Sequence, residues 1–150
     1  MSKYFLFFIL SFSFLAVPVN SSNLKANVNE IIDSGKEACG PSFQLKENAV
    51  KYIDMSGDGQ NDVIVVDEHE FFCPDKGYSY YCGSGGCMVY FLAETDQLEG
   101  LIRGWEVLQS EWGDKIILLA LHGSSCRQAG AVPCFKAISF YKGRFVSQKR

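Results

Sequence analysis

The sequence is poor in the residues and motifs on which common catalytic and nucleotide-binding sites depend. Its 150 residues include two histidines, His69 and His122, and no two cysteines are spaced as Cys-x-x-Cys. No glycine-rich segment joins a strand to a helix, and the Gly-x-Ser-x-Gly pattern of a nucleophile turn does not occur. These absences exclude motif-based nucleotide binding and the common serine hydrolases, and they argue against a structural zinc site held by cysteines.

An excess of positive charge is also missing. The chain carries 14 basic and 17 acidic residues, for a net charge of −3, and no broad basic stretch. The basic residues within 142–150 are interpreted as a solvated end, because an isolated basic tip is a poor footprint for phosphates. Nucleic acid is therefore not an expected partner. Because no low-complexity linker divides the chain, we predict one domain.

The N-terminus has the order of an export signal. Lys3 precedes an apolar run over residues 4–17, Pro18 breaks the run, and polar residues follow. We predict cleavage near Ser21, which gives a signal peptide at 1–21 and a single domain at 22–150. A retained membrane anchor is the alternative, but the run is shorter than about 20 residues and is interrupted by serines. The mature protein is thus expected in the periplasm or outside the cell, with no membrane span.

All six cysteines lie in the predicted mature part, and an even number after an export signal indicates three disulfides. Six cysteines allow 15 pairings, among which the sequence does not choose. Cys126 and Cys134 are the easiest local pair. Cys73 with Cys82 is a second local possibility, which would leave Cys39 with Cys87.

Hydrophobic periodicity predicts a mainly β (α+β) fold. Apolar residues at helical spacing predict one N-terminal helix over residues 24–34, with Gly35 as its stop. Short β-branched or alternating runs, separated by Gly-containing turns, are typical of strands in an antiparallel β-meander. We predict strands at residues 49–53, 63–66, 88–92, 100–108, 115–121, 135–141 and 144–146.

The segment between the first two predicted strands is the one motif with clear chemistry. Side-chain oxygens fall at alternate positions, Asp54, Ser56 and Asp58, and Asp62 follows after the carbonyl of Gln60. Calcium needs six to eight oxygen ligands at short range, and a tightly turning loop brings alternate residues to one centre. The alternative is an Asp/Gly turn without metal, since these residues are ordinary turn formers. We expect any bound calcium to be structural.

This stretch resembles the calcium loop of the FG-GAP/VCBS repeat families, which reads Asp-x-Asp/Asn-x-Asp-Gly-x-x-Asp before an apolar strand. The resemblance covers about 20 of the 150 residues and implies a β-hairpin whose loop holds calcium. Ser56 replaces the usual Asp or Asn, which should weaken binding, and a single copy implies no propeller. An EF-hand is excluded, because Val65 stands where its bidentate Glu belongs.

Two further segments allow both a functional and a structural interpretation. Tyr78, Tyr80 and Tyr81 stand in a predicted loop, where they would form a partner-binding surface if exposed or cover the core if not. The glycine-rich residues between Cys82 and Cys87 would form either an anion-binding nest or a tight turn pinned by a disulfide.

Catalytic arrangements are weaker candidates. His122 lies near Ser124 and Ser125, but proximity in sequence does not show that a base, a nucleophile and an acid are in contact. The acidic residues 67, 68 and 70 would serve either as a carboxylate pair for sugar hydrolysis or as a solvated strand end. We therefore expect an exported non-enzymatic binding or structural module with a protein or glycan partner. A small secreted hydrolase, or an inhibitor of one, is the alternative.

Overall fold

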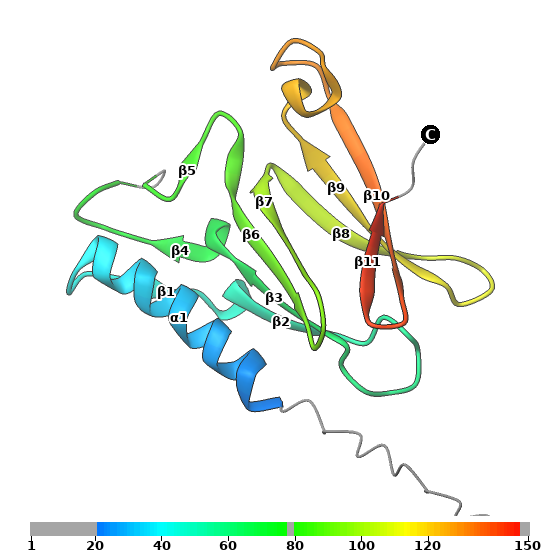
Figure 1. Cartoon of the computed structure of the whole chain (residues 1–150). Coiled ribbons are helices and arrows are strands. Elements are labelled where there is room, and N and C mark those ends of the chain that lie inside the picture. The colour runs from blue at the N-terminus through cyan, green and yellow to red at the C-terminus, as the bar shows by residue number, and fades with distance from the viewer. Residues whose placement is uncertain (1–20, 78–79, 148–150) are drawn as a thin grey trace, which may run out of the picture.

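The computed structural model describes residues 21–77 and 80–147 (Figure 1). The predicted signal peptide, except for Ser21, lies outside the described residues, as does Tyr78. The described chain is mainly β, with antiparallel sheets, one α-helix and three disulfides. The predicted fold class is therefore confirmed.

Helix α1, Ser21–Cys39, is longer than the predicted helix and passes through Gly35. It ends where Gly40 takes a φ of +89° and donates its N–H to the carbonyl of Lys36 at 2.7 Å. Gly35 is thus not the predicted stop. It is needed for packing, because a Cβ built there would lie 2.8 Å from the ring of Phe71.

The first sheet has five antiparallel strands in the order β2-β3-β6-β5, with β7 also pairing with β6. Their bounds are β2 Val50–Ile53, β3 Val63–Asp67, β5 Cys82–Gly83, β6 Gly86–Ala93 and β7 Gln97–Ile102. Short strands β1 Gln44–Leu45 and β4 Phe71–Phe72 form a separate pair. Three 3₁₀ helices also occur in the described chain: η1 Glu47–Ala49, η2 Glu68–Glu70 and η3 Gly123–Cys126.

The second sheet has four antiparallel strands in the order β11-β10-β9-β8. Their bounds are β8 Gly104–Gln109, β9 Lys115–Leu121, β10 Cys134–Tyr141 and β11 Arg144–Ser147. The single predicted strand at 100–108 is wrong, because the chain leaves the first sheet after β7 and enters the second at β8. Arg103 lies between them, and its N–H already donates to Ala120 of β9 at 2.8 Å.

The two sheets pack face to face, and α1 covers the outer face of the first sheet (Figure 1). Between the sheets lies a core that includes Val65, Phe91 and Ile117, while Val28 of α1 packs with Val66 in a second cluster. Every residue of β3 is buried because both of its faces are covered. The outer face of the second sheet is covered by no described element.

The disulfides join Cys39 to Cys73, Cys82 to Cys87 and Cys126 to Cys134. The local Cys126–Cys134 pair is confirmed. The alternative that joined Cys73 to Cys82 and Cys39 to Cys87 is wrong, because Cys82 and Cys87 stand opposite each other on β5 and β6 with Cα atoms 4.2 Å apart. Three disulfides indicate an oxidising, exported environment.

Among the described residues, no helix is both long enough and apolar enough to span a bilayer.

Candidate functional site

The loop between β2 and β3 is held together by hydrogen bonds from its own backbone to its aspartates. Asp62 Oδ2 accepts the N–H groups of Met55 and Ser56 at 2.8 and 2.7 Å. Asp58 Oδ1 accepts the N–H of Gln60 at 2.8 Å. The carboxylate of Asp62 therefore turns onto the start of the loop, whereas that of Asp58 caps a local turn.

Asp54 closes the same loop from the other end. Its Oδ1 and Oδ2 accept the N–H groups of Gly57 at 2.6 Å and Gly59 at 3.0 Å. Lys115 of β9 donates to the Asp54 carbonyl at 2.5 Å, and its Nζ lies 3.9 Å from Asp54 Oδ2. Burial acts to raise the pKa of Asp54, but the two N–H donors, Lys115 and the Ser56 hydroxyl outweigh it and hold this pKa below its ordinary value. Asp54 is therefore ionised under neutral conditions.

A groove of about 840 Å³ opens beside this loop, where it meets the β8–β9 turn and the β10–β11 hairpin. Two acidic residues of the loop, Asp58 and Asp62, and two basic residues, Lys115 and Lys142, line it. Its lining is completed by Met55, Ser56, Gly113, Asp114, Ile116, Ser139, Phe140, Tyr141, Gly143 and Val146. The groove thus brings the sequence-predicted oxygen donors to a surface that is also partly aromatic.

The donor set agrees with a hard cation in its chemistry, because Asp54, Ser56, Asp58 and Asp62 offer only oxygen atoms. Each ionised carboxylate oxygen also keeps acceptor capacity after one hydrogen bond. In the described part of the chain, however, no three Asp, Glu, His or Cys side chains converge on one point. For calcium to bind, the Asp58 side chain would therefore have to give up its hydrogen bond from the Gln60 N–H and turn toward Asp54 and Asp62.

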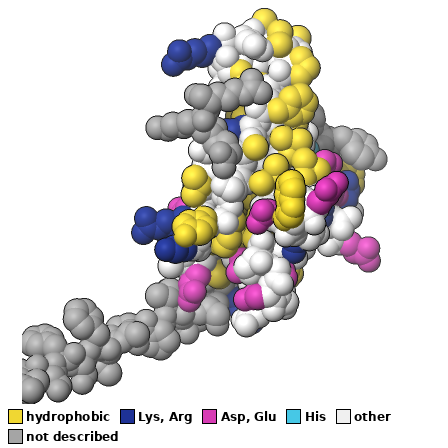
Figure 2. Space-filling view, turned by 90° about the vertical axis from the view of Figure 1, so that its right-hand side faces the viewer, with side chains coloured by type: hydrophobic (Ala, Val, Ile, Leu, Met, Phe, Trp, Pro, Cys, Tyr) yellow, Lys and Arg dark blue, Asp and Glu magenta, His cyan; other side chains and the backbone are white. Residues whose placement is uncertain are grey.

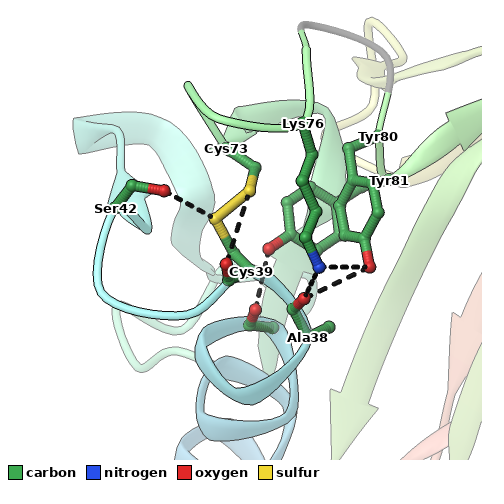
Figure 3. Close-up of a disulfide and its surroundings, with 8 residues drawn as sticks. Ala38, Cys39, Ser42, Cys73, Lys76, Tyr80 and Tyr81 are labelled. Atoms are coloured by element: carbon green, nitrogen blue, oxygen red, sulfur yellow. Dashed lines mark hydrogen bonds between the residues drawn. A yellow bond between two sulfur atoms is a disulfide. The ribbon is translucent and has the colours of Figure 1, made fainter.

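The predicted aromatic surface is partly a structural cluster (Figure 3). Tyr81 donates its hydroxyl hydrogen to the Gly35 carbonyl at 2.7 Å, and its ring meets that of Phe71 edge-on at 5.5 Å. Burial, followed by Tyr80 and Glu68, raises the pKa of Tyr81, so the hydroxyl remains a donor. Tyr81 therefore caps a carbonyl of α1 and covers the core.

Tyr80 lies beside this cluster and keeps 42% of its surface exposed. Its hydroxyl and the Lys76 ammonium both donate to the Ala38 carbonyl, at 3.2 and 2.5 Å. Together with the Cys39–Cys73 disulfide, these contacts fix the C-terminal end of α1 (Figure 3). The Tyr80 ring is therefore only partly open to solvent, because the Lys76 Nζ lies 4.6 Å from its centroid and the Tyr81 ring meets it edge-on at 5.0 Å.

The glycine-rich loop between Cys82 and Cys87 is a tight turn pinned by their disulfide, as one of its two interpretations predicted. The carbonyl of Ser84 accepts hydrogen bonds from Arg103 Nε at 3.1 Å and from Nη2 at 2.8 Å. The Arg103 side chain thereby ties this hairpin to the crossing between the two sheets.

His122 has a structural role at the start of η3. Its Nδ1 lies 2.7 Å from the Ser124 hydroxyl and 3.4 Å from the Ser124 N–H, so the imidazole caps the turn. On the other side of the ring, the backbone at Gly130 approaches so closely that a Cβ there would clash with Nε2. The backbone thus packs against Nε2, whereas Nδ1 is the nitrogen in contact with the Ser124 hydroxyl.

Asp67 was predicted as part of a solvated acidic strand end, and this is wrong because it is 7% exposed. Its Oδ1 lies 2.6 Å from His69 Nδ1, and its Oδ2 accepts the Trp105 indole N–H at 2.8 Å. The bond from Trp105 joins β8 of the second sheet to β3 of the first. Sequence reasoning missed this link because the partners are 38 residues apart.

Fold and site together define a small disulfide-linked α+β domain, in which two antiparallel sheets pack face to face and an acidic loop lies at one end of the interface. Comparison of the chain with protein families, with curated proteins and with solved structures found no match.

Proposed function

We propose that the mature chain is an exported, non-enzymatic binding or structural module whose β2–β3 loop is stabilised by calcium. The proposal places the protein in the periplasm or outside the cell. There, extracellular calcium modules with dissociation constants of about 10⁻⁴–10⁻³ M are occupied. Calcium would supply positive charge to a loop that carries Asp54, Asp58 and Asp62.

The observation that carries the proposal is the inward orientation of the first and last aspartates of the loop. Asp54 and Asp62 both accept hydrogen bonds from the loop backbone, so two carboxyl side chains already point into one turn. Asp58 and Ser56 line the adjoining groove, where solvent ions reach them. A bound cation would reduce the repulsion among these carboxylates and would join the two ends of the loop.

The non-enzymatic part of the proposal is supported by the structural use of the candidate catalytic groups. His122 caps η3, and Asp67 is engaged by His69 and Trp105. The partner is proposed to be a protein or a glycan that contacts the exposed part of Tyr80. Aromatic rings beside polar oxygens suit both kinds of partner.

Thermal unfolding of the oxidised mature protein in EDTA and in about 10 mM calcium tests this function. A dissociation constant of about 10⁻⁴–10⁻³ M would add about 1.4–2.7 kcal/mol of stability, which corresponds to a rise of about 5–10 °C in the melting temperature. Asp58→Ala should abolish the rise, because it removes a ligand while leaving the hydrogen bonds to Asp54 and Asp62 in place.

Asp114→Ala is the matched control, because Asp114 lines the same groove from outside the loop. This variant should retain the full calcium response. Identical melting of the wild-type protein in EDTA and in calcium would overturn the metal proposal.

A further inference from the structure

The outer face of the second sheet is apolar, and no element of the described chain covers it. The inner-facing residues of β8, β9 and β10 include Trp105, Ile117 and Ile138, so the alternate residues of these strands point outward. The apolar members of the outward set include Leu108, Ile116, Leu118, Phe135, Tyr141 and Val146. Figure 2, which looks onto this side of the molecule, shows hydrophobic side chains gathered in a band.

Several of these apolar side chains are strongly exposed: Leu108 at 38%, Phe135 at 62%, Tyr141 at 63% and Val146 at 42%. Strands β8, β9, β10 and β11 are six, seven, eight and four residues long and lie about 4.8 Å apart, so they span a plane of about 400 Å². Contiguous apolar patches of this size on soluble proteins are commonly interaction sites.

The charges on this face are few and lie at opposite edges. Glu106 is on β8, one edge strand, and Arg144 is on β11, the other edge strand. Both are exposed, and neither forms an ion pair within the described residues. If a second copy of this face packed against the first with its two edges exchanged, the acidic edge of each copy would meet the basic edge of the other. The apolar centres of the two copies would then pack together.

The strand register allows one twofold axis to make this match. Through the β9 residue between them, Glu106 of β8 is in register with Ala137 of β10, and Arg144 of β11 is paired with Tyr141 of β10. The two charged residues are therefore three strand spacings apart across the sheet and four residues apart along the strands. These offsets are about 14 Å and about 13 Å. Their midpoint falls between Ile116 and Ser139, which are themselves paired.

We propose that this face is a homodimer interface, in which a twofold axis between Ile116 and Ser139 pairs Glu106 of each copy with Arg144 of the other. The same operation brings Leu118 toward Val146 and Leu108 toward Tyr141 of the second copy. Because the two offsets are nearly equal, the strands of the two copies cross at about 90°, which is one of the two common arrangements of packed sheets.

Two such faces would bury about 800 Å² in total, which is below the range of stable specific interfaces and belongs to weak, transient association. The dimer is therefore weak, and its dissociation constant is expected in the micromolar range or above. Reciprocal contact between identical surfaces also closes the assembly at two copies, so no larger oligomer forms.

Sedimentation equilibrium of the oxidised mature protein, from about 10 μM to about 1 mM, tests the proposal. Glu106→Arg alone and Arg144→Glu alone each replace two attractive contacts by two repulsive ones, so each should weaken dimerisation about tenfold or more. The double variant Glu106→Arg with Arg144→Glu exchanges the charges and should restore the dissociation constant to within about threefold of the wild-type value.

Glu99→Arg is the matched control, because Glu99 is an exposed acidic residue on β7 of the first sheet, and it should leave dimerisation unchanged. Far-UV circular dichroism would establish that each variant is folded. A wild-type chain that stays monomeric at about 1 mM would overturn the proposal. A dimer that is insensitive to both single reversals, or one that the double variant does not restore, would overturn it equally.

Discussion

The two sheets have similar strands but different surroundings. Strand β3 in the first sheet is buried on both faces, because α1 packs on one side and the second sheet on the other. Strand β9 in the second sheet is equally apolar in sequence, yet only its inward residues Ile117 and Leu119 are buried. The outward residues of β9 are covered by no described element of the chain.

This difference shows what a continuous apolar run specifies. Such a run indicates a strand that has two apolar faces, and it does not indicate what covers them. In the first sheet the cover is α1, which the Cys39–Cys73 disulfide holds at its C-terminal end. In the second sheet, the cover we propose is another copy of the chain.

The largest expected effect comes from placing a charge on each outer face in turn. Val66, on the helix-covered face, is 0% exposed, so Val66→Asp should cost more than about 4 kcal/mol and leave little folded protein. Leu118→Asp, on the bare face, should cost about 1 kcal/mol or less in a dilute monomer. Urea unfolding at low protein concentration measures both. Equal losses would show that Leu118 is covered within one chain, and the contrast between the sheets would fail.

Removing one disulfide at a time compares the link that holds α1, Cys39–Cys73, with the link in the second sheet, Cys126–Cys134. Replacing Cys39 and Cys73 by Ser opens a link over 34 residues, and replacing Cys126 and Cys134 opens one over 8 residues. The chain-entropy relation gives losses of about 3.8 and about 2.5 kcal/mol. Guanidinium unfolding of the two double variants should reproduce this order. If removal of the Cys39–Cys73 disulfide cost less than removal of the Cys126–Cys134 disulfide, the packing of α1 on the first sheet would not depend on its disulfide.

Trp105→Phe tests the polar contact between the sheets. The variant keeps a ring next to Phe91 but loses the N–H bond to Asp67 Oδ2, which leaves a buried carboxylate oxygen without that donor. We expect a loss of about 2 kcal/mol in urea unfolding. Trp112→Phe is the control, since Trp112 is 87% exposed, and its stability should equal that of the wild-type protein.

The smallest effect concerns Glu68, which lines a hollow together with residues of α1. Burial raises the pKa of Glu68, and the neighbouring Asp67 adds to the rise, while the Tyr90 hydroxyl acts against it. A carboxyl whose pKa is raised on folding favours the folded state below its unfolded pKa, and this contribution is lost as the pH rises. Because Glu68 is partly exposed, solvent screening keeps the effect small.

Glu68→Gln should therefore match the wild-type protein at about pH 3 and exceed its stability by up to about 0.5 kcal/mol at about pH 7. Melting temperatures at both pH values measure the difference. Asn27→Ala, in the same hollow, is a neutral control that should shift stability equally at both pH values. If Glu68→Gln raised stability equally at about pH 3 and about pH 7, the gain would come from packing and not from the ionisation of Glu68.

Most of the fold was predictable because its strands are short, apolar and separated by turns. The predicted strands at 115–121 and 63–66 agree with β9 and β3 to within a residue. The end of α1 was not predictable, because Gly35 is explained by a ring from Phe71 that is distant in sequence. The break at Arg103 was missed for a similar reason, since the segment on either side of it is equally strand-like.

The candidate site was predictable only as a loop. The oxygen side chains at alternate positions located residues 54–62, but the Lys115 ammonium at Asp54 comes from a strand 61 residues away. The burial of Asp67 was likewise hidden, because local sequence gives no sign of Trp105 across the sheet interface. Long-range partners such as these decide whether an aspartate is a ligand, a cap or a buried acceptor.

Because the chain crosses from one sheet to the other at Arg103, we expect that neither sheet folds without the other. A single residue connects β7 to β8, so a cut there would give two fragments that each expose one wall of the shared core. Neither fragment retains the opposing sheet against which its apolar wall packs. The mature chain should consequently unfold in one cooperative transition, with circular dichroism and tryptophan fluorescence changing together.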